Sequence, residues 1–257
     1  MLKVITCFKW VMDEADIKVD ANSRRLILDR VGYKISLYDR NAIEEAARLQ
    51  EQHGASVVAI TVAPPTAKQC LKDALSRGPD KACFVNDPSL VDLEPAQTTA
   101  ILAAAIKAQG DFDLVICGEG SGDLYTQQVG PALAEKLEVP CATYVNKLTY
   151  VDGEKRIIAE RKLDDCVEVV SIVLPALITV LPDINTPRIP TLKQVLAAGK
   201  KPVDNITLDA LGGACEGCMQ TTGILAATME RRHLKFGTEE EDIRALIGAL
   251  LKEGVIA

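Results

Sequence analysis

The residues LVICGEGSGDLYTQQVGPALAEKL, positions 114–137, carry the change from strand to helix that decides the fold. A short apolar run at residues 114–117 predicts a buried strand, and the pattern over residues 125–137 predicts a helix. Glycines at 118, 120 and 122 lie between them, in a spacing that is neither GxGxxG nor GxxxxGK(S/T). The order of strand, Gly-rich loop and helix is typical of a phosphate-binding loop.

The same alternation extends on both sides of this stretch. Further strands are predicted at residues 4–8, 57–62 and 82–85, and helices at residues 39–52, 66–76 and 94–109. Strands joined through helices form right-handed crossovers, so the sheet is predicted to be mostly parallel, and continuous apolar strands indicate that both faces are covered. The sequence therefore predicts a doubly wound α/β fold. Such sheets bind ligands at the carboxyl ends of their strands, here after Phe8, Val62 and Cys117.

The character of the sequence changes after Tyr144. Residues 145–160 and 166–181 predict long strands, with turn signals at Asp152-Gly153 and Asp164-Asp165. Residues 17–34 predict another hairpin, with residues 20–23 as its turn. We expect these segments to form a small antiparallel layer at one edge of the sheet.

The chain loses clear periodicity beyond Pro187, and a last helix is predicted to begin at Thr238, with Glu241 completing a capping box. The apolar stripe of this helix consists of Ile243, Leu246, Ile247, Leu250 and Leu251. The stripe either packs on its own domain or docks on a partner subunit, and both interpretations stay open. We divide the chain into a nucleotide-binding α/β domain with the antiparallel edge layer, residues 1–202, and a C-terminal arm, residues 203–257.

Composition excludes two classes of function. With a formal net charge of −7 and 4% aromatic residues, the chain lacks the clustered positive field and the stacking side chains that broad nucleic-acid binding requires. The longest apolar run, residues 169–181, is interrupted by Pro175 and is shorter than the ~20 residues that span a bilayer. No signal peptide is visible, because Lys3 and Lys9 interrupt the first apolar segment. We expect a cytoplasmic protein without a transmembrane segment.

Eight cysteines are present, and six of them lie among apolar neighbours and are expected to be buried: Cys7, Cys70, Cys83, Cys117, Cys141 and Cys166. A chain of this length without a signal peptide is not expected to carry a disulfide framework. Cys215 and Cys218 form the one CxxC pair, with His233 as the only nearby histidine. Metal binding would need further ligands, so a solvated loop is favoured and no metal site is predicted.

No catalytic constellation stands out. The two histidines, His53 and His233, do not follow predicted strands, and the GxSxG, HExxH and P-loop lysine motifs are absent. We therefore assign no catalytic residues and favour binding over hydrolysis or group transfer.

The Gly-rich loop has a direct physical interpretation. Its three glycines let backbone N–H groups approach an anion and admit positive φ, and Ser121 offers a hydroxyl. Residues 126–128 are predicted in the first turn of the helix, where the helix dipole favours phosphate. Because the loop contains no basic residue, it suits a retained nucleotide. The alternative is an ordinary strand-to-helix turn with Asp123 as its N-cap.

Four segments together resemble the beta subunit of electron transfer flavoprotein: KWVMDEADIKVD (9–20), SLYDRNAIEEAARLQEQHG (36–54), ALSRGPDKA (74–82) and AERKLDDCVEVVSIVLPALIT (159–179). The last is the most specific, since it matches the family fingerprint at Arg161, Asp164-Asp165, Glu168, Val170 and Pro175. The resemblance runs from the N-terminus to about Pro202. It implies an adenine-nucleotide-hydrolase-like form of the doubly wound fold.

The resemblance implies a heterodimer with an alpha subunit, with FAD at the alpha/beta interface and the C-terminal arm packing on alpha. It also implies an adenine nucleotide in beta, which is AMP in ordinary members and a second FAD in electron-bifurcating members. Carried over by position, the cofactor-binding residues are Cys7, Ser36, Leu37, Tyr38, Asp39, Val62, Gly118, Glu119, Gly120, Ser121, Gly122, Asp123, Leu124, Tyr125, Thr126, Gln127, Gln128 and Val129. They include the loops that the strand-end argument selects.

Three departures from the family pattern bear on these cofactors. Met12 replaces a proline, and Glu14 stands where some members place an aromatic residue near the alpha-bound flavin. The loop from Thr126 to Pro131 is closer to bifurcating members, and to the subgroup associated with nitrogen fixation and carnitine metabolism, than to the AMP-type loop. The resemblance therefore favours FAD over AMP in beta, with AMP retained as the alternative.

The family engages a partner dehydrogenase through an exposed leucine, which corresponds to Leu192. The alternative is that Leu192 starts a short helix and faces the core.

The implied function is to shuttle electrons through FAD between an acyl-CoA or other dehydrogenase and a quinone or ferredoxin-type acceptor, with NADH-linked bifurcation left open. Two hypotheses compete with it. One is an adenine-nucleotide-binding regulatory module without a redox role, and the other is an ATP-consuming ligase, which the lack of basic residues in the loop disfavours.

Overall fold

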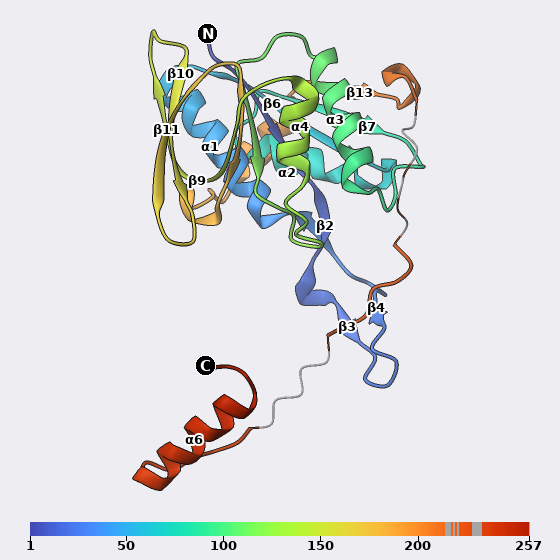
Figure 1. Ribbon diagram of the computed structural model, residues 1–257. Coiled ribbons are helices and arrows are strands. Elements are labelled where there is room, and N and C mark those ends of the chain that lie inside the picture. Colours follow the sequence, from blue (N-terminus) through green and yellow to red (C-terminus); the bar gives the residue numbers. More distant parts are fainter. Residues whose placement is uncertain (214–216, 218, 220, 228–232, 257) are drawn as a thin grey trace. The chain divides into compact units, whose positions relative to one another are not determined.

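The computed structural model describes residues 1–213, 217, 219, 221–227 and 233–256 of the 257-residue chain. The described chain forms two compact units. The larger unit consists of Met1–Lys18 and Ile27–Gly223, and the smaller one of Val19–Leu26 and Ile224–Ala257. The larger unit contains the sheet on which the candidate site is built (Figure 1).

A nine-stranded sheet organises the larger unit. Its spatial order is β11-β10-β9-β12-β8-β1-β6-β7-β13, and all neighbours pair in parallel except β10, which is antiparallel to both β9 and β11. This confirms the predicted mostly parallel sheet. The strands are β1 (Lys3–Cys7), β6 (Ser56–Ala63), β7 (Lys81–Asn86), β8 (Leu114–Gly118), β9 (Cys141–Val151), β10 (Arg156–Lys162), β11 (Val167–Val173), β12 (Ala176–Val180) and β13 (Val203–Ile206).

Helices cover both faces of this sheet, as a doubly wound fold requires (Figure 1). One face carries α1 (Leu37–His53), α2 (Gln69–Ser76) and α5 (Leu192–Ala198), and the other carries α3 (Pro95–Ala108) and α4 (Val129–Leu137). Strands β6 and β7 lie on one side of β1, and β8 and β12 lie on the other. The chain therefore reverses its direction of winding beside β1, which makes the carboxyl end of β1 the topological switch point.

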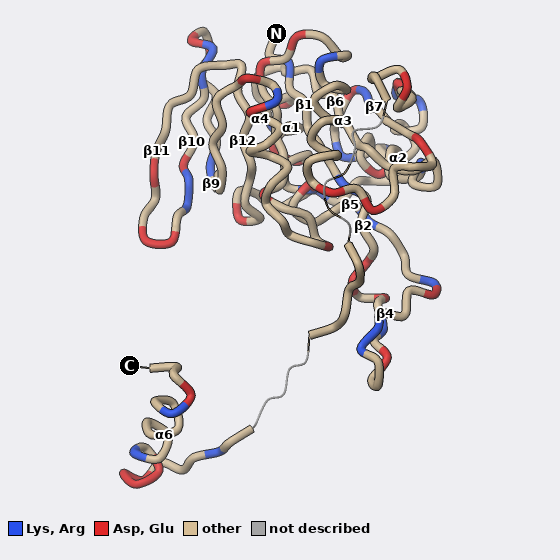
Figure 2. Tube along the Cα trace, turned by 45° about the vertical axis from the view of Figure 1, so that its right-hand side comes forward, with Lys and Arg blue, Asp and Glu red and all other residues tan. Residues whose placement is uncertain are grey.

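The predicted antiparallel segments at 145–160 and 166–181 continue the main sheet at one edge, where β10 pairs antiparallel with β9 and β11. The turns at Asp152-Gly153 and Asp164-Asp165 are confirmed, and the second one is the red tip between β10 and β11 in Figure 2. The segment at 166–181, predicted as one long strand, divides at Leu174-Pro175 into β11 and β12. Strand β12 is buried throughout, because it pairs with β8 and β9 inside the parallel part of the sheet.

Two small sheets account for the rest of the N-terminal region. Strand β2 (Trp10–Met12) pairs antiparallel with β5 (Tyr33–Ile35), and β3 (Lys18–Val19) pairs with β4 (Leu26–Ile27). The predicted turn at residues 20–23 is confirmed, since the Asp20 carboxylate accepts hydrogen bonds from the backbone N–H groups of Asn22 and Ser23. Such carboxylate-to-backbone bonds are what favour aspartate at the first position of a turn.

Helix α6 (Glu240–Lys252), in the smaller unit, begins later than predicted. Its N-cap is Glu239, no side chain caps it, and the expected capping box is therefore wrong. The helix start is favoured instead by acidic residues in its first turn, which complement the helix dipole and appear red in Figure 2. The helix carries the predicted apolar stripe, and four members of the stripe are exposed: Ile243, Leu246, Ile247 and Leu251.

Burial of the cysteines agrees with the sequence at four positions and differs at two. Cys7, Cys70, Cys83 and Cys117 are buried, whereas Cys141 and Cys166 are exposed. Both exceptions lie at or just before the first residue of a strand, β9 or β11, outside the helical layers. Cys215 and Cys218 lie outside the described residues. No helix in the described ranges is long and apolar enough to cross a membrane.

Candidate functional site

An open cleft lies at the carboxyl ends of β1, β6 and β8, where the strand-end argument places the site. Its empty volume, counting the open mouth, is about 850 Å³, which is within the range of small-molecule sites. Twelve of the residues predicted to bind a cofactor line it: Cys7, Asp39, Val62, Gly118, Glu119, Gly120, Ser121, Leu124, Thr126, Gln127, Gln128 and Val129. The cleft thus brings together four segments that are far apart in the sequence, around Cys7, Asp39, Val62 and residues 118–129.

The other predicted residues stand behind this lining and support it. The backbone N–H of Gly122 donates to the Ser36 hydroxyl at 3.2 Å. The rings of Tyr38 and Tyr125 pack with their centroids 5.1 Å apart. Leu37, the first residue of α1, and Asp123 also lie outside the lining. The Ser36 bond and the contact between Tyr38 and Tyr125 hold the shape of the loop at 118–128.

Eight lining residues were not predicted from the sequence: Phe8, Lys9, Leu93, Pro95, Thr98, Leu102, Cys117 and Gly130. Lys9 matters most, since it is the one lysine or arginine among the lining residues, and its Nζ lies 2.6 Å from Asp123 Oδ2. The sequence did point to Lys9, because it lies two residues beyond the carboxyl end of β1. The start of α3, the helix that follows β7, brings Pro95 and Thr98 to the cleft.

A buried carboxyl group joins the walls of the cleft. Asp39, in the first turn of α1, accepts hydrogen bonds from the backbone N–H of Lys9 at 2.8 Å and from that of Gly118 at 3.2 Å. Burial raises the pKa of Asp39 to about 7, although both N–H donors act in the opposite direction. Asp39 therefore ties the N-terminus of α1 to the ends of β1 and β8.

Two glycines of the loop, Gly118 and Gly120, are required for close contact and not for their backbone angles. A Cβ at Gly118 would lie 2.7 Å from Asp39 Oδ1 and 2.8 Å from the carbonyl carbon of Tyr38. A Cβ at Gly120 would lie 2.7 Å from the Tyr125 ring. The expected positive φ is wrong at all three glycines. The left-handed residues are instead Tyr125, with φ of 47°, and Gln127, with φ of 56°.

These two left-handed residues are strained, because a side chain with a Cβ disfavours that region by about 1–2 kcal/mol. The Tyr125 hydroxyl donates to Glu119 Oε1 at 2.6 Å, and this bond raises the pKa of Tyr125 to about 12. This hydrogen bond and the ring contact with Tyr38 hold Tyr125 in its strained conformation. Strain of this kind concentrates at functional sites.

Helix α4 begins at Val129 and not at Tyr125, so the predicted helix start is wrong by four residues. Residues 126–128 precede the helix, and Gln128 is its N-cap. Asp123 does not cap the helix. Its carboxylate instead accepts from the Ser121 hydroxyl and the Leu124 N–H within the loop. The free N–H groups of the first turn of α4 begin at Val129, which lines the cleft together with Gly130.

The groups at the cleft suit ligand binding. The carboxyls of Asp39 and Glu119 are engaged by hydrogen bonds, and Lys9, paired with Asp123, supplies the one cation of the lining. Contact with Cys7 and burial raise the pKa of the Cys117 thiol, so this sulfur is protonated and a poor nucleophile. In the described ranges, no three His, Cys, Asp or Glu side chains gather where they could hold a metal ion.

The mostly parallel sheet, covered by helices on both faces, defines the chain as a doubly wound α/β protein, and its cleft lies at the switch point, where such folds bind their ligands. The chain belongs to the electron transfer flavoprotein domain family, whose model matches residues 25–211, well over half of its length. The match is to the family as a whole. It covers the start of α1, the Gly-rich loop, all of β8 to β13 and α5.

Proposed function

We propose that the chain is the beta subunit of a heterodimeric electron transfer flavoprotein and that its cleft binds an adenine nucleotide. The observation that carries this proposal is the cleft at the carboxyl ends of β1, β6 and β8 in a chain of this family. FAD at the interface with an alpha subunit would supply the electron chemistry when bound. The residues of this chain hold and orient the nucleotide and dock the redox partners.

The cleft residues fit an adenine nucleotide in three ways. Gly118 and Gly120 leave no Cβ between the loop and the residues packed on it, so the loop lies close to α1 and to Tyr125 and keeps the wall of the cleft in shape. The unpaired N–H groups at the start of α4 and the ammonium group of Lys9 are donors for phosphate oxygens. Two apolar residues, Leu93 just before α3 and Leu102 within it, line the same cleft and offer a surface for an aromatic ring.

The identity of the nucleotide is the finer part of the proposal. We favour a second FAD over AMP, because residues 126–131 resemble the loop of bifurcating members. An FAD here would place a second redox centre within beta, where NADH could reduce it.

Co-expression with a flavin-carrying alpha subunit is expected to give one beta per alpha by light scattering. Cofactors released by denaturation should then show two FAD per heterodimer, and NADH should bleach part of the flavin absorbance. One FAD and one AMP, with no response to NADH, would contradict bifurcation and leave the electron-shuttling role. Bound adenine nucleotide without any flavin would favour the regulatory module instead.

The same preparation tests the C-terminal arm, residues 203–257. We propose that the exposed apolar face of α6 packs on the alpha subunit, since four of its large apolar residues are uncovered. A chain ending at residue 237 lacks this helix but keeps the whole nine-stranded sheet. It should yield less heterodimer than the full chain, and an equal yield would contradict the arm's proposed contact.

We also propose that Leu192 anchors a partner dehydrogenase. Leu192 is the first residue of α5 and is 75% exposed, so the alternative of a core position is wrong. An exposed leucine on a short helix, flanked by Lys193, can enter an apolar pocket with a charged rim.

Leu192→Ala is expected to weaken partner docking about 30-fold, which corresponds to the ~2 kcal/mol typical of an interface anchor. Interprotein electron transfer from an acyl-CoA dehydrogenase, reduced with its acyl-CoA substrate, measures the effect. The flavin absorbance should not change. Val169→Ala is the matched control, because Val169 is similarly exposed but lies on β11. Equal loss in both variants would count against a docking role.

A further inference from the structure

Residues 189–200 carry exposed apolar side chains but bury almost none of their own surface. Ile189 is 92% exposed and Leu196 is 63% exposed, and both lie near Leu192 in the sequence. Of these twelve residues, all of them described, Ala198 alone is buried. Hydrophobic burial therefore orders the segment only in part, through the packing of α5 on α2 at Ala198. Polar contacts at its two ends supply the rest.

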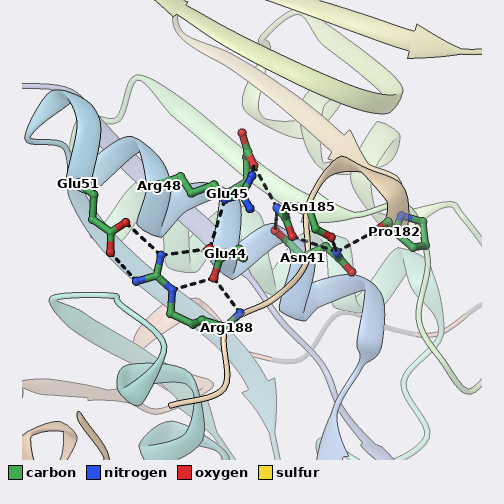
Figure 3. Close-up of polar contacts among 8 residues, drawn as sticks. All are labelled: Asn41, Glu44, Glu45, Arg48, Glu51, Pro182, Asn185 and Arg188. Atoms are coloured by element: carbon green, nitrogen blue, oxygen red, sulfur yellow. Dashed lines mark hydrogen bonds and ion pairs between the residues drawn. The ribbon is translucent and has the colours of Figure 1, made fainter. Parts of the chain in front are cut away.

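The first end is held by Arg188. Its guanidinium donates to both oxygens of Glu44, at 2.7 and 3.1 Å, and to both oxygens of Glu51, at 2.5 and 3.2 Å (Figure 3). Burial alone would raise the pKa of Glu44, but the Arg188 bonds outweigh it and hold the pKa below its usual value. The backbone is held as well, since Arg77 Nη1 donates to the Arg188 carbonyl at 3.0 Å.

A second set of contacts fixes the chain just before Arg188. Asn185 Nδ2 donates to Glu45 Oε2 and to the Asn41 carbonyl, each at 3.0 Å (Figure 3). In return, Asn41 Nδ2 donates to the carbonyls of Asn185 and Pro182. Asn41 and Glu45 lie one turn apart on α1. Their hydrogen bonds therefore hold residues 182–185, which lead into the segment, along this helix.

The other end is held by Lys201. Its ammonium group donates to three backbone carbonyls, those of Leu75 at 2.9 Å, Gly78 at 2.9 Å and Pro79 at 2.6 Å. These carbonyls lie at the end of α2 and just beyond it, where a cation is also favoured by the helix dipole. Partial burial lowers the pKa of Lys201, which shows that the group is drawn out of water. All three ammonium hydrogens can be used in this arrangement.

We infer that Arg188 and Lys201 are positioning residues that hold residues 189–200 in a fixed conformation for docking. The inference rests on the docking role proposed above for Leu192. A segment already ordered before binding loses less conformational entropy in the complex, so the same contacts give higher affinity. Residues 189–203 contain no acidic residue, although the whole chain has a net charge of −7. The occupant is therefore a redox partner with an apolar pocket and a rim of carboxylates.

The test uses the heterodimer with Arg188→Gln combined with Glu44→Gln, so that no buried carboxylate loses its partner. Hydrogen exchange of the peptides covering 189–200 should become faster. With reduced acyl-CoA dehydrogenase as donor, the KM for the dehydrogenase should rise about tenfold while kcat changes little, as expected for lost binding without lost chemistry. Lys201→Met should have the same effect from the other end of the segment.

Arg48→Gln is the matched control. Arg48 also bonds to Glu44, at 3.2 Å, but does not touch the segment, so exchange at 189–200 and the KM should stay unchanged. Unchanged exchange in the double variant would overturn the inference, and so would faster exchange with an unchanged KM while Leu192→Ala still raises it. If Leu192→Ala leaves the KM unchanged, the docking role itself fails and the inference falls with it.

Discussion

Asp39→Asn is expected to gain stability relative to the unchanged protein as the pH rises from 5 to 8. Asp39 has a pKa of about 7 when folded and about 3.9 when unfolded, so the folded chain binds the extra proton between these values. The stability of the unchanged protein therefore falls as the pH rises through this window. Asparagine does not titrate, so the difference in free energy of unfolding should shift by about 3 kcal/mol in favour of the variant.

Urea unfolding of both proteins at pH 5 and pH 8 measures this shift. Asp87→Asn is the control, because Asp87 lies in an exposed loop where its carboxylate accepts from Ser89. It should show no comparable gain at pH 8. A difference between Asp39→Asn and the unchanged protein that is the same at both pH values would mean that Asp39 is ionised throughout, and that its two N–H donors outweigh its burial.

The sheet was predictable because its signals are local. Continuous apolar runs in β1, β6 and β8 are long enough to identify, and helices of ordinary length separate them. The parallel arrangement followed from general rules of winding, which also predicted a ligand site at the carboxyl ends of the strands. The cleft lies at those ends for the same reason.

The shape of the loop was not predictable, because distant residues decide it. The propensity of Tyr125 and Gln127 favours continuing the helix, yet both are left-handed, and Tyr125 is held there by Glu119 and Tyr38. The need for glycine at 118 depends on α1, which lies about 80 residues earlier. The periodicity of the sequence shows neither the contacts of Tyr125 nor the packing of Gly118 on α1.

The polar network on α1 was hidden for a related reason. Helical periodicity places Glu44 and Glu45 on the polar side of α1, which normally faces water. Both are buried, because Asn185 and Arg188 come back across that side and pair with them. A sequence pattern separates polar from apolar faces, but it does not show which polar face a later segment will cover.

Gly118→Ala is expected to remove most of the nucleotide from the purified heterodimer and to lower its stability by about 1–3 kcal/mol, the usual cost of overpacking. The new methyl group would meet the Tyr38 backbone at 2.8 Å and the Asp39 carboxylate at 2.7 Å, both part of the fixed start of α1. Either β8 or α1 must move. That movement breaks the bond from the Gly118 N–H to Asp39 and shifts the cleft wall.

Two neighbouring glycines make this prediction a graded one. At Gly120 the added methyl group meets the Tyr125 side chain, which can give way, so Gly120→Ala should lose less nucleotide. At Gly122 the nearest atom is Val11 Cγ2 at 3.9 Å, an ordinary contact, so Gly122→Ala should retain the nucleotide and the stability. Nucleotide released per heterodimer and thermal unfolding measure the series. Equal losses in all three would mean that any side chain in the loop blocks the ligand. Full retention in Gly118→Ala would place the nucleotide away from this wall, because a ligand that rests on β8 and α1 must respond when they separate.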